Sequence, residues 1–144
     1  MQAIKDLVLK IKPSAVVSTH TWGRVVLTPY GDSMLDCPDY DQYKVVVSQM
    51  AKLSGYRWMR ACDMYGVGGI LNNPPPKEDE LVKLPIHGSE VDWFYRHGAM
   101  AIVSEVGTHQ RIPTLQDIQT ELGLNKQAFY YFIREAPKVQ LKVK

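Results

Sequence analysis

The sequence predicts an α/β protein, because segments with a strand pattern alternate with segments with a helical pattern along the chain. Residues 99–106, AMAIVSEV, form a near-continuous apolar run, which is typical of a fully buried central strand. Residues 40–53 repeat apolar side chains at helical spacing, with the inner face formed by Tyr43, Val46, Val47, Met50 and Leu53. At 144 residues the chain has the length of one domain with a real core, and it contains no internal repeat.

The composition is that of an ordinary soluble globular protein, with 45% hydrophobic and 22% charged residues. A net charge of +2, with lysines gathered near the C-terminus, favours neither a nucleic-acid partner nor an anionic membrane surface. No apolar run has the length of a transmembrane helix, and the N-terminus lacks the apolar core of a signal peptide. Cys37 and Cys62 have no CxxC spacing, so a disulfide and two free thiols both remain open.

The N-terminal part of the chain predicts a helix and then two strands. Residues 3–12 place apolar side chains on one stripe of a helix, at Ile4, Leu7, Val8 and Ile11. No N-cap residue precedes this helix, which suggests a chain cut from something longer, and Pro13 ends it. A strand over residues 15–19 then leads to His20, and a second apolar run ends in a Pro-Tyr-Gly turn. Residues 31–38 are predicted to be a polar loop.

After Gly55, which closes the helix over residues 40–53, the next pattern is strand-like over residues 56–62. Residues 66–83 are rich in Gly and Pro and predict a loop. The GVGG at its start has neither a lysine nor a following helix, so it is not interpreted as a phosphate site. A short helix is predicted to begin at Ser89.

The C-terminal part predicts two more helices. A capping box at residues 114–117 opens the first. Asn125 is predicted to cap the second, whose inward side chains are Phe129, Phe132 and Ile133. Pro137 ends it, and residues 139–144, VQLKVK, alternate like the first strand of a following β module.

Two ionisable residues stand at the ends of predicted strands, where binding and reacting groups collect in α/β sheets. His20 taken alone is either a hydrogen-bonded structural residue or a functional one. Glu105 lies inside the apolar run, near its end, where a carboxylate needs a metal, a partner or proton uptake to compensate its burial. A bond to backbone amides or to Arg111 is the structural alternative.

Three ordered segments carry a resemblance to a known family. They are residues 18–31, STHTWGRVVLTPYG, residues 88–95, GSEVDWFY, and the strand that ends at Glu105. This series resembles the zinc carboxypeptidases of the pancreatic A/B type over about residues 3–136. The resemblance implies the C-terminal part of a mixed-sheet α/β/α zinc carboxypeptidase-like domain, here residues 1–137. Residues 138–144 would then be a tail, or the start of a following β module.

The resemblance implies a zinc-dependent hydrolase that removes the C-terminal residue of peptides. His20 would supply one zinc ligand, and Glu105 would be the catalytic general base. Val91 falls where the family sets its side-chain preference, and a valine there favours an apolar or aromatic terminal residue. Trp22 would line the neighbouring substrate subsite or simply pack in the core. Leu84 replaces the family's substrate-capping tyrosine, so a phenol donor to the substrate is lost.

The family's other two zinc ligands form a His-x-x-Glu motif well before the third, and its carboxylate-binding arginines also lie in that earlier half. Because these 144 residues lack that half, we expect poor peptidase activity and zinc binding that needs ligands from a missing N-terminal segment. The chain would associate with that missing half, or with itself through an open sheet edge.

Two further interpretations remain open. One is a non-catalytic carboxypeptidase-like module that binds peptides or proteins. The other is an independent zinc site formed by His20, His87 and Glu90, although the neighbours of His87 align with the specificity loop rather than with the ligand motif. Because the family is mostly exported, the resemblance implies an extracellular location.

Overall fold

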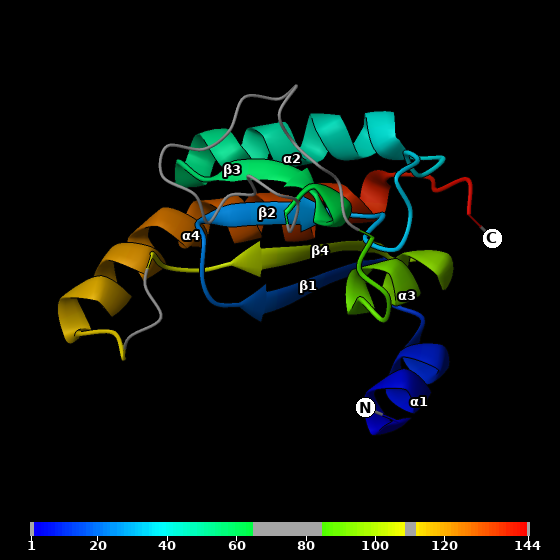
Figure 1. Ribbon diagram of the computed structural model, residues 1–144, viewed down its shortest axis with the longest axis horizontal. Helices are drawn as coiled ribbons and strands as arrows, with labels where there is room; N and C mark the ends of the chain where they lie inside the picture. The colour runs from blue at the N-terminus through cyan, green and yellow to red at the C-terminus, as the bar shows by residue number, and fades with distance from the viewer. Residues whose placement is uncertain (1, 65–84, 109–111, 144) are drawn as a thin grey trace.

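The structure is a computed structural model that describes residues 2–64, 85–108 and 112–143. It confirms the α/β class (Figure 1). The helices are α1 (Gln2–Ile11), α2 (Tyr40–Ser54), α3 (Glu90–Arg96) and α4 (Leu115–Glu135), with short 3₁₀ helices η1 (Ala61–Asp63) and η3 (Ala136–Lys138). The strands are β1 (Ala15–His20), β2 (Val25–Thr28), β3 (Arg57–Arg60) and β4 (Met100–Glu105).

The four strands form one mixed sheet in the order β1-β4-β2-β3. Strand β4 is parallel to β1 and antiparallel to β2, and β2 is parallel to β3. All six residues of β4 are buried, which confirms the central strand predicted from its apolar run. Strand β1 is an edge of this sheet, with Thr19 and His20 exposed.

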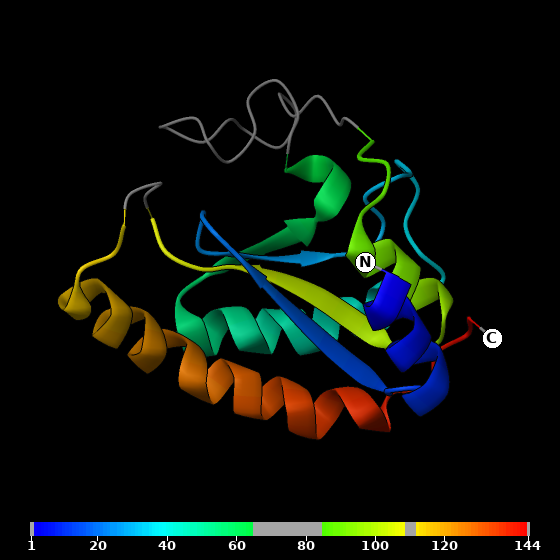
Figure 2. The same cartoon turned by 90° about the horizontal axis from the view of Figure 1, so that it is seen from below.

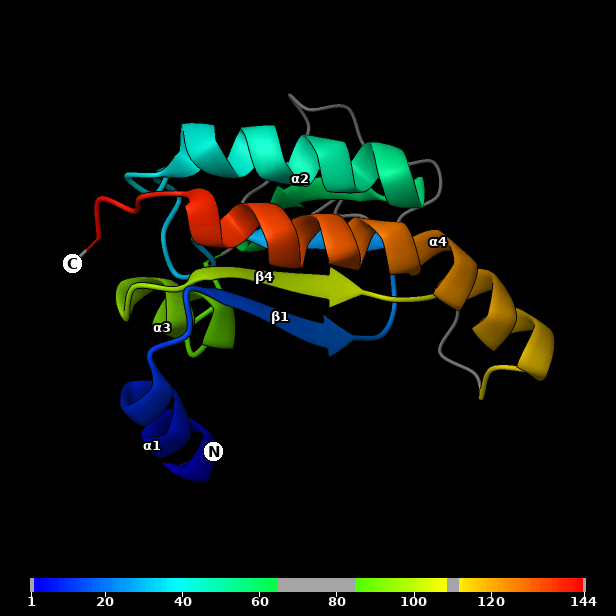
Figure 3. The same cartoon turned by 180° about the vertical axis from the view of Figure 1, so that it is seen from behind.

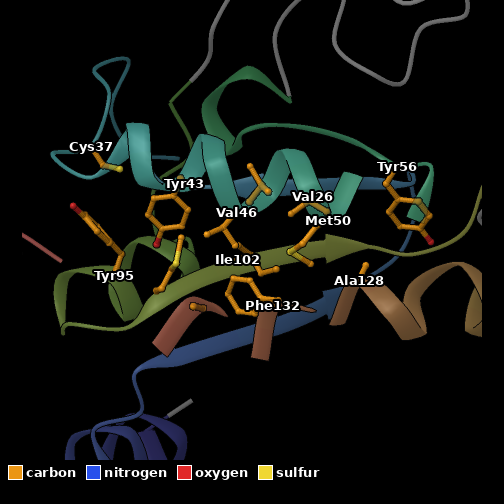
Figure 4. Close-up of a cluster of buried hydrophobic side chains, with 13 residues drawn as sticks. Val26, Cys37, Tyr43, Val46, Met50, Tyr56, Tyr95, Ile102, Ala128 and Phe132 are labelled. Carbon is orange, nitrogen blue, oxygen red and sulfur yellow. The ribbon is translucent and has the colours of Figure 1, made fainter. Parts of the chain in front are cut away.

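Helices lie on both faces of the sheet. Successive side chains of a strand point to opposite faces, and those of β4 are buried on both. Figures 2 and 3 show α2 and α4 side by side over one face and α3 on the other. On the first face Met100 and Ile102 of β4 pack with Tyr43 and Phe132 in the larger cluster (Figure 4). On the second face Ala101 and Val103 pack in a second cluster whose other members include Val8, Leu27, Val91 and Phe94.

Helix α4 differs from the prediction, since it runs without a break past Asn125. The Thr114–Asp117 capping box is present at its start. Asn125 caps nothing, because its amide donates to the Tyr56 hydroxyl (2.7 Å) and to the Glu121 carbonyl within the helix (2.9 Å). Phe132 is buried as predicted, but the inward position predicted for Ile133 is wrong, since its side chain is exposed.

Helix α2 ends as predicted, with Gly55 in the left-handed conformation (φ 70°). Its inner face is correct except for Leu53, which is exposed. The strand-like segment after Gly55 is shorter than expected, because the chain turns into η1 after Arg60. The loop predicted over residues 66–83 lies outside the described residues.

The apolar stripe of α1 is largely uncovered in this structure. The helix forms as predicted, and Val8 is buried. The other three residues of the stripe are 54–58% exposed: Ile4, Leu7 and Ile11. In the described part of the chain, no helix is long and apolar enough to cross a membrane.

Residues 139–143 form no strand, although their alternation suggested one. Val139, Leu141 and Val143 instead pack against the larger core cluster. The Asp39 carboxylate accepts the backbone N–H of Lys142 (3.0 Å) and the Tyr95 hydroxyl (2.7 Å). The C-terminal segment is therefore held on the domain in this structure.

Candidate functional site

The candidate site lies where the two parallel strands β1 and β4 end. His20 and Glu105 are the last residues of these strands and are paired in the sheet register. His20 Nδ1 lies 3.9 Å from Glu105 Oε1. The chain beyond each strand stays close, because the Gly23 N–H donates to the Gly107 carbonyl (2.8 Å). The structure thus brings together the predicted metal ligand and the predicted base.

Glu105 is a buried carboxylate. Glu105 is 4% exposed, and this burial is the main cause that raises the pKa of its carboxyl group above the ordinary glutamate value. The nearby His20 lowers this pKa and Glu90 raises it. Within the described residues, Glu105 Oε2 is buried without a hydrogen-bond partner. Arg111, its alternative structural partner, lies outside the described residues.

A third ionisable side chain, Glu90, completes the cluster. It is the first residue of α3, and its Oε1 lies 2.7 Å from His20 Nε2. The Ser18 hydroxyl donates to the same oxygen (3.0 Å). Ser18 and His20 share one face of β1, because they are two residues apart on a strand. The sequence pattern suggested Glu90 only as a zinc ligand together with His20 and His87, and it gave no signal for a direct hydrogen bond between Glu90 and the His20 ring.

Helix α3 is fixed to the turn after β2 by Asp92. Its carboxylate accepts the backbone N–H groups of Gly31 and Asp32, each at 2.9 Å. Arg96, one turn further on, donates to both Asp32 oxygens at 2.6 and 2.7 Å. Asp92 of the Asp-Trp pair thus binds the Pro-Tyr-Gly turn through the backbone of Gly31. These bonds also hold Glu90 beside β1.

The predicted substrate-binding residues are placed as follows. Trp22 is half-buried in the connection after His20, so its side chain is in part accessible. Val91 is buried in the second core cluster together with Leu27 and Val103. Leu84 lies outside the described residues. The substrate contacts assigned to these three side chains stay predictions.

A catalytic zinc ion usually has three protein ligands. The described residues contain no group of three His, Cys, Asp or Glu side chains that could hold a metal ion. His87 is exposed and does not complete such a group with His20 and Glu90, so the structure does not support an independent zinc site there. His20 itself suits the role of one ligand, since its side chain is 48% exposed and its Nδ1 lies beside an incompletely bonded carboxylate. Cys37 and Cys62 are both buried and are not joined in a disulfide.

The family model for the zinc carboxypeptidases, peptidase M14, matches residues 1–130. The chain therefore belongs to the zinc carboxypeptidase family, as the sequence resemblance indicated. A search of curated protein sequences gave no match.

Solved structures with the same fold include thrombin-activatable fibrinolysis inhibitor, TAFI, with a TM-score of 0.72 and 15% identity over 95% of this chain. Bovine TAFI, in complex with tick carboxypeptidase inhibitor, is also similar, with a TM-score of 0.74 and 15% identity over 95% of this chain. At this identity the likeness shows the fold alone. The chain spans 33% and 45% of the length of these two proteins.

Proposed function

We propose that this chain is part of a zinc-dependent metallocarboxypeptidase, a hydrolase that removes the C-terminal residue of peptides or proteins. The observation that supports this best is the pairing of His20 with Glu105 at the ends of two parallel strands. In this proposal His20 is one zinc ligand and Glu105 is the general base. Membership of the zinc carboxypeptidase family agrees with both roles.

The chemistry assigned to Glu105 follows from its surroundings. A base that works near neutral pH needs a carboxyl pKa above the ordinary value, and burial raises that of Glu105. Its carboxylate would take a proton from the attacking water and pass it to the leaving amine. A zinc ion held there would polarise the peptide carbonyl and lower the pKa of the attacking water.

For the substrate, we propose an apolar or aromatic C-terminal residue. Val91 carries no charge that could pair with a terminal Lys or Arg. Trp22 would line the adjoining subsite, and Leu84 would stand where the family has a capping tyrosine. Bovine TAFI binds tick carboxypeptidase inhibitor, which illustrates a protein partner of this fold.

The proposed site needs ligands that the described residues do not supply. We propose that they come from an N-terminal half of the domain, which would also cover the exposed stripe of α1 and the open edge at β1. Without that half the same surfaces favour self-association. An extracellular location follows from the family resemblance and belongs to the proposal.

The first test is zinc binding by the purified 144-residue chain, with His20→Ala as the comparison. Weak binding that falls further in His20→Ala is expected for one ligand of an incomplete set. Tight one-to-one binding that is lost in His20→Ala would contradict the proposal that the site needs further ligands. It would instead support the independent zinc site of His20, His87 and Glu90.

The second test uses the longer protein, if an upstream reading frame carries His-x-x-Glu and an arginine-rich segment. We expect it to release an apolar C-terminal residue from peptides, and Glu105→Gln to reduce kcat by about 10²- to 10⁴-fold. The alternative is a non-catalytic peptide-binding module. It predicts no such upstream motif and peptide binding that Glu105→Gln leaves unchanged.

A further inference from the structure

The His20 ring lies between two carboxylates at different distances. Its Nε2 is 2.7 Å from Glu90 Oε1, which is a hydrogen-bond distance. Its Nδ1 is 3.9 Å from Glu105 Oε1, which is too long for one. A neutral imidazole has a single N–H, and an ionised carboxylate can only accept. The proton of the neutral ring therefore belongs on Nε2, and Nδ1, on the side of Glu105, keeps its lone pair.

We propose that Glu90 is a positioning residue for His20, which fixes the Nε2–H tautomer and the ring orientation so that Nδ1 remains the metal-binding atom. This inference deepens the proposed function and rests on it for the role of Nδ1. Metal-ligating histidines usually donate their other N–H to a carboxylate or carbonyl, which sets the tautomer and raises the basicity of the ligand. Glu90 occupies that position here.

The carboxylate of Glu90 is itself held in place. The Ser18 hydroxyl donates to the same oxygen that accepts from His20, at 3.0 Å. The Glu90 side chain is only 25% exposed, so water competes less for its hydrogen bond with His20 than it would at an open surface. Asp92, two residues further along α3, binds the backbone N–H groups of Gly31 and Asp32 and so fixes the first turn of the helix. Glu90 is thus presented by an anchored element.

The chain contains an internal control at the end of the same helix. His97 Nδ1 lies 2.6 Å from the Trp93 carbonyl, which can only accept, so neutral His97 must carry its proton on Nδ1. His20 and His97 should therefore be opposite tautomers. Loss of the Glu90 carboxylate should affect His20 alone, whereas disruption of α3 would affect His97 as well.

The test is ¹⁵N NMR of the histidine rings in the metal-free 144-residue chain, assigned with single His→Gln variants. The spectra are compared at an alkaline pH above which the ring shifts no longer change, so that the shifts report the tautomer of the neutral ring. We expect His20 to be the Nε2–H form and His97 the Nδ1–H form. In Glu90→Ala the two His20 nitrogen shifts should move toward each other as the second tautomer becomes populated, with His97 unchanged.

Two further variants sharpen the result. Glu90→Gln should restore the wild-type His20 shifts, because its amide oxygen still accepts from Nε2. Glu105→Gln, which changes the more distant carboxylate, should leave the His20 tautomer as it is. A wild-type His20 in the Nδ1–H form, or His20 shifts that do not change in Glu90→Ala, would overturn the proposal. Because this readout needs no metal, it fails or succeeds separately from the zinc-binding test of the proposed function.

Discussion

His20 and Glu105 are the last residues of two parallel strands and are paired in register, so both side chains lie at the same end of the strands. The strands that carry them differ in surroundings, since β1 is an edge and β4 is central. His20 is consequently half exposed, whereas Glu105 is buried with a raised pKa. An accessible imidazole beside a buried carboxylate is consistent with the roles of metal ligand and general base that we propose for them.

Gly31 allows the turn after β2 to lie close to α3 and η1. A Cβ at this position would lie 3.2 Å from Ala61 Cβ and 3.4 Å from Ser89 Cβ. We expect Gly31→Ala to lower the free energy of unfolding by about 1–2 kcal/mol, because neither neighbour is the end of a flexible side chain. Urea denaturation measures this difference.

Gly123 is the matched control. It lies within α4, and a Cβ there would meet nothing within 4 Å. Gly123→Ala should raise the free energy of unfolding by about 0.5–1 kcal/mol, because alanine loses less backbone entropy in a helix. Equal effects of the two substitutions would show that the close approach at Gly31 is unimportant.

Glu121 joins α4 to the sheet through two partners. It accepts from the Arg24 guanidinium at 2.7 and 2.9 Å and from the Tyr56 hydroxyl, whose pKa is raised to about 12 mainly by burial. We expect Glu121→Ala to destabilise the chain by about 2 kcal/mol, because it leaves the part-buried hydroxyl and the guanidinium without their acceptor.

Glu135→Ala is the control, since it makes the same substitution near the end of α4. Thermal unfolding measures the stability of both variants. The partners of Glu135, Arg134 and Lys138, are exposed, so little change is expected. If the two variants lost the same stability, the buried network around Glu121 would contribute nothing specific.

Asp39 holds the C-terminal segment, since its carboxylate accepts the Lys142 N–H and the Tyr95 hydroxyl. We expect Asp39→Ala to speed trypsin cleavage after Lys138 by about tenfold, which corresponds to a loss of about 1.4 kcal/mol of local stability. Mass spectrometry identifies the product. The exposed Asp6 of α1, replaced by alanine, is the control and should leave the rate unchanged. Equal cleavage in both variants would contradict the role of Asp39.

The Asp32–Arg96 pair should make stability depend on pH. The hydrogen bond from Arg96 is the main cause that lowers the pKa of Asp32. A lowered pKa contributes stability above the ordinary aspartate value of about 3.9, and this contribution is lost as the pH falls through the folded-state value.

The side chains of Asp32 and Arg96 are 22% and 47% exposed, so we expect Asp32→Asn to cost at most about 1 kcal/mol at pH 7. The difference between the two proteins should shrink as the pH falls below the ordinary aspartate value and through the lower folded-state pKa of Asp32. Urea titrations of both proteins across this range measure it. A difference that stays constant would show that the ion pair is not its source.

The sequence by itself determined the local structure. The apolar run before Glu105 predicted the central strand, Thr114 and Asp117 predicted the start of α4, and Gly55 predicted the end of α2. These features depend on neighbours within a few residues, so periodicity and capping preferences are sufficient to find them. The ordered motif series was also sufficient to indicate the family, because its residues and their spacing are properties of the sequence alone.

The tertiary structure decided what depends on distant neighbours. Asn125 resembles a helix cap in sequence, but Tyr56, 69 positions away, supplies a partner that keeps it inside a continuous helix. Residues 139–143 alternate like a strand in sequence, but they form a packed tail because Asp39 and the larger core cluster lie beside them. Glu90 reaches His20 and Ser18 because α3 packs on the sheet and Asp92 binds the turn after β2. Each outcome reflects hydrogen bonds and burial between residues far apart in the chain, which local propensity does not encode.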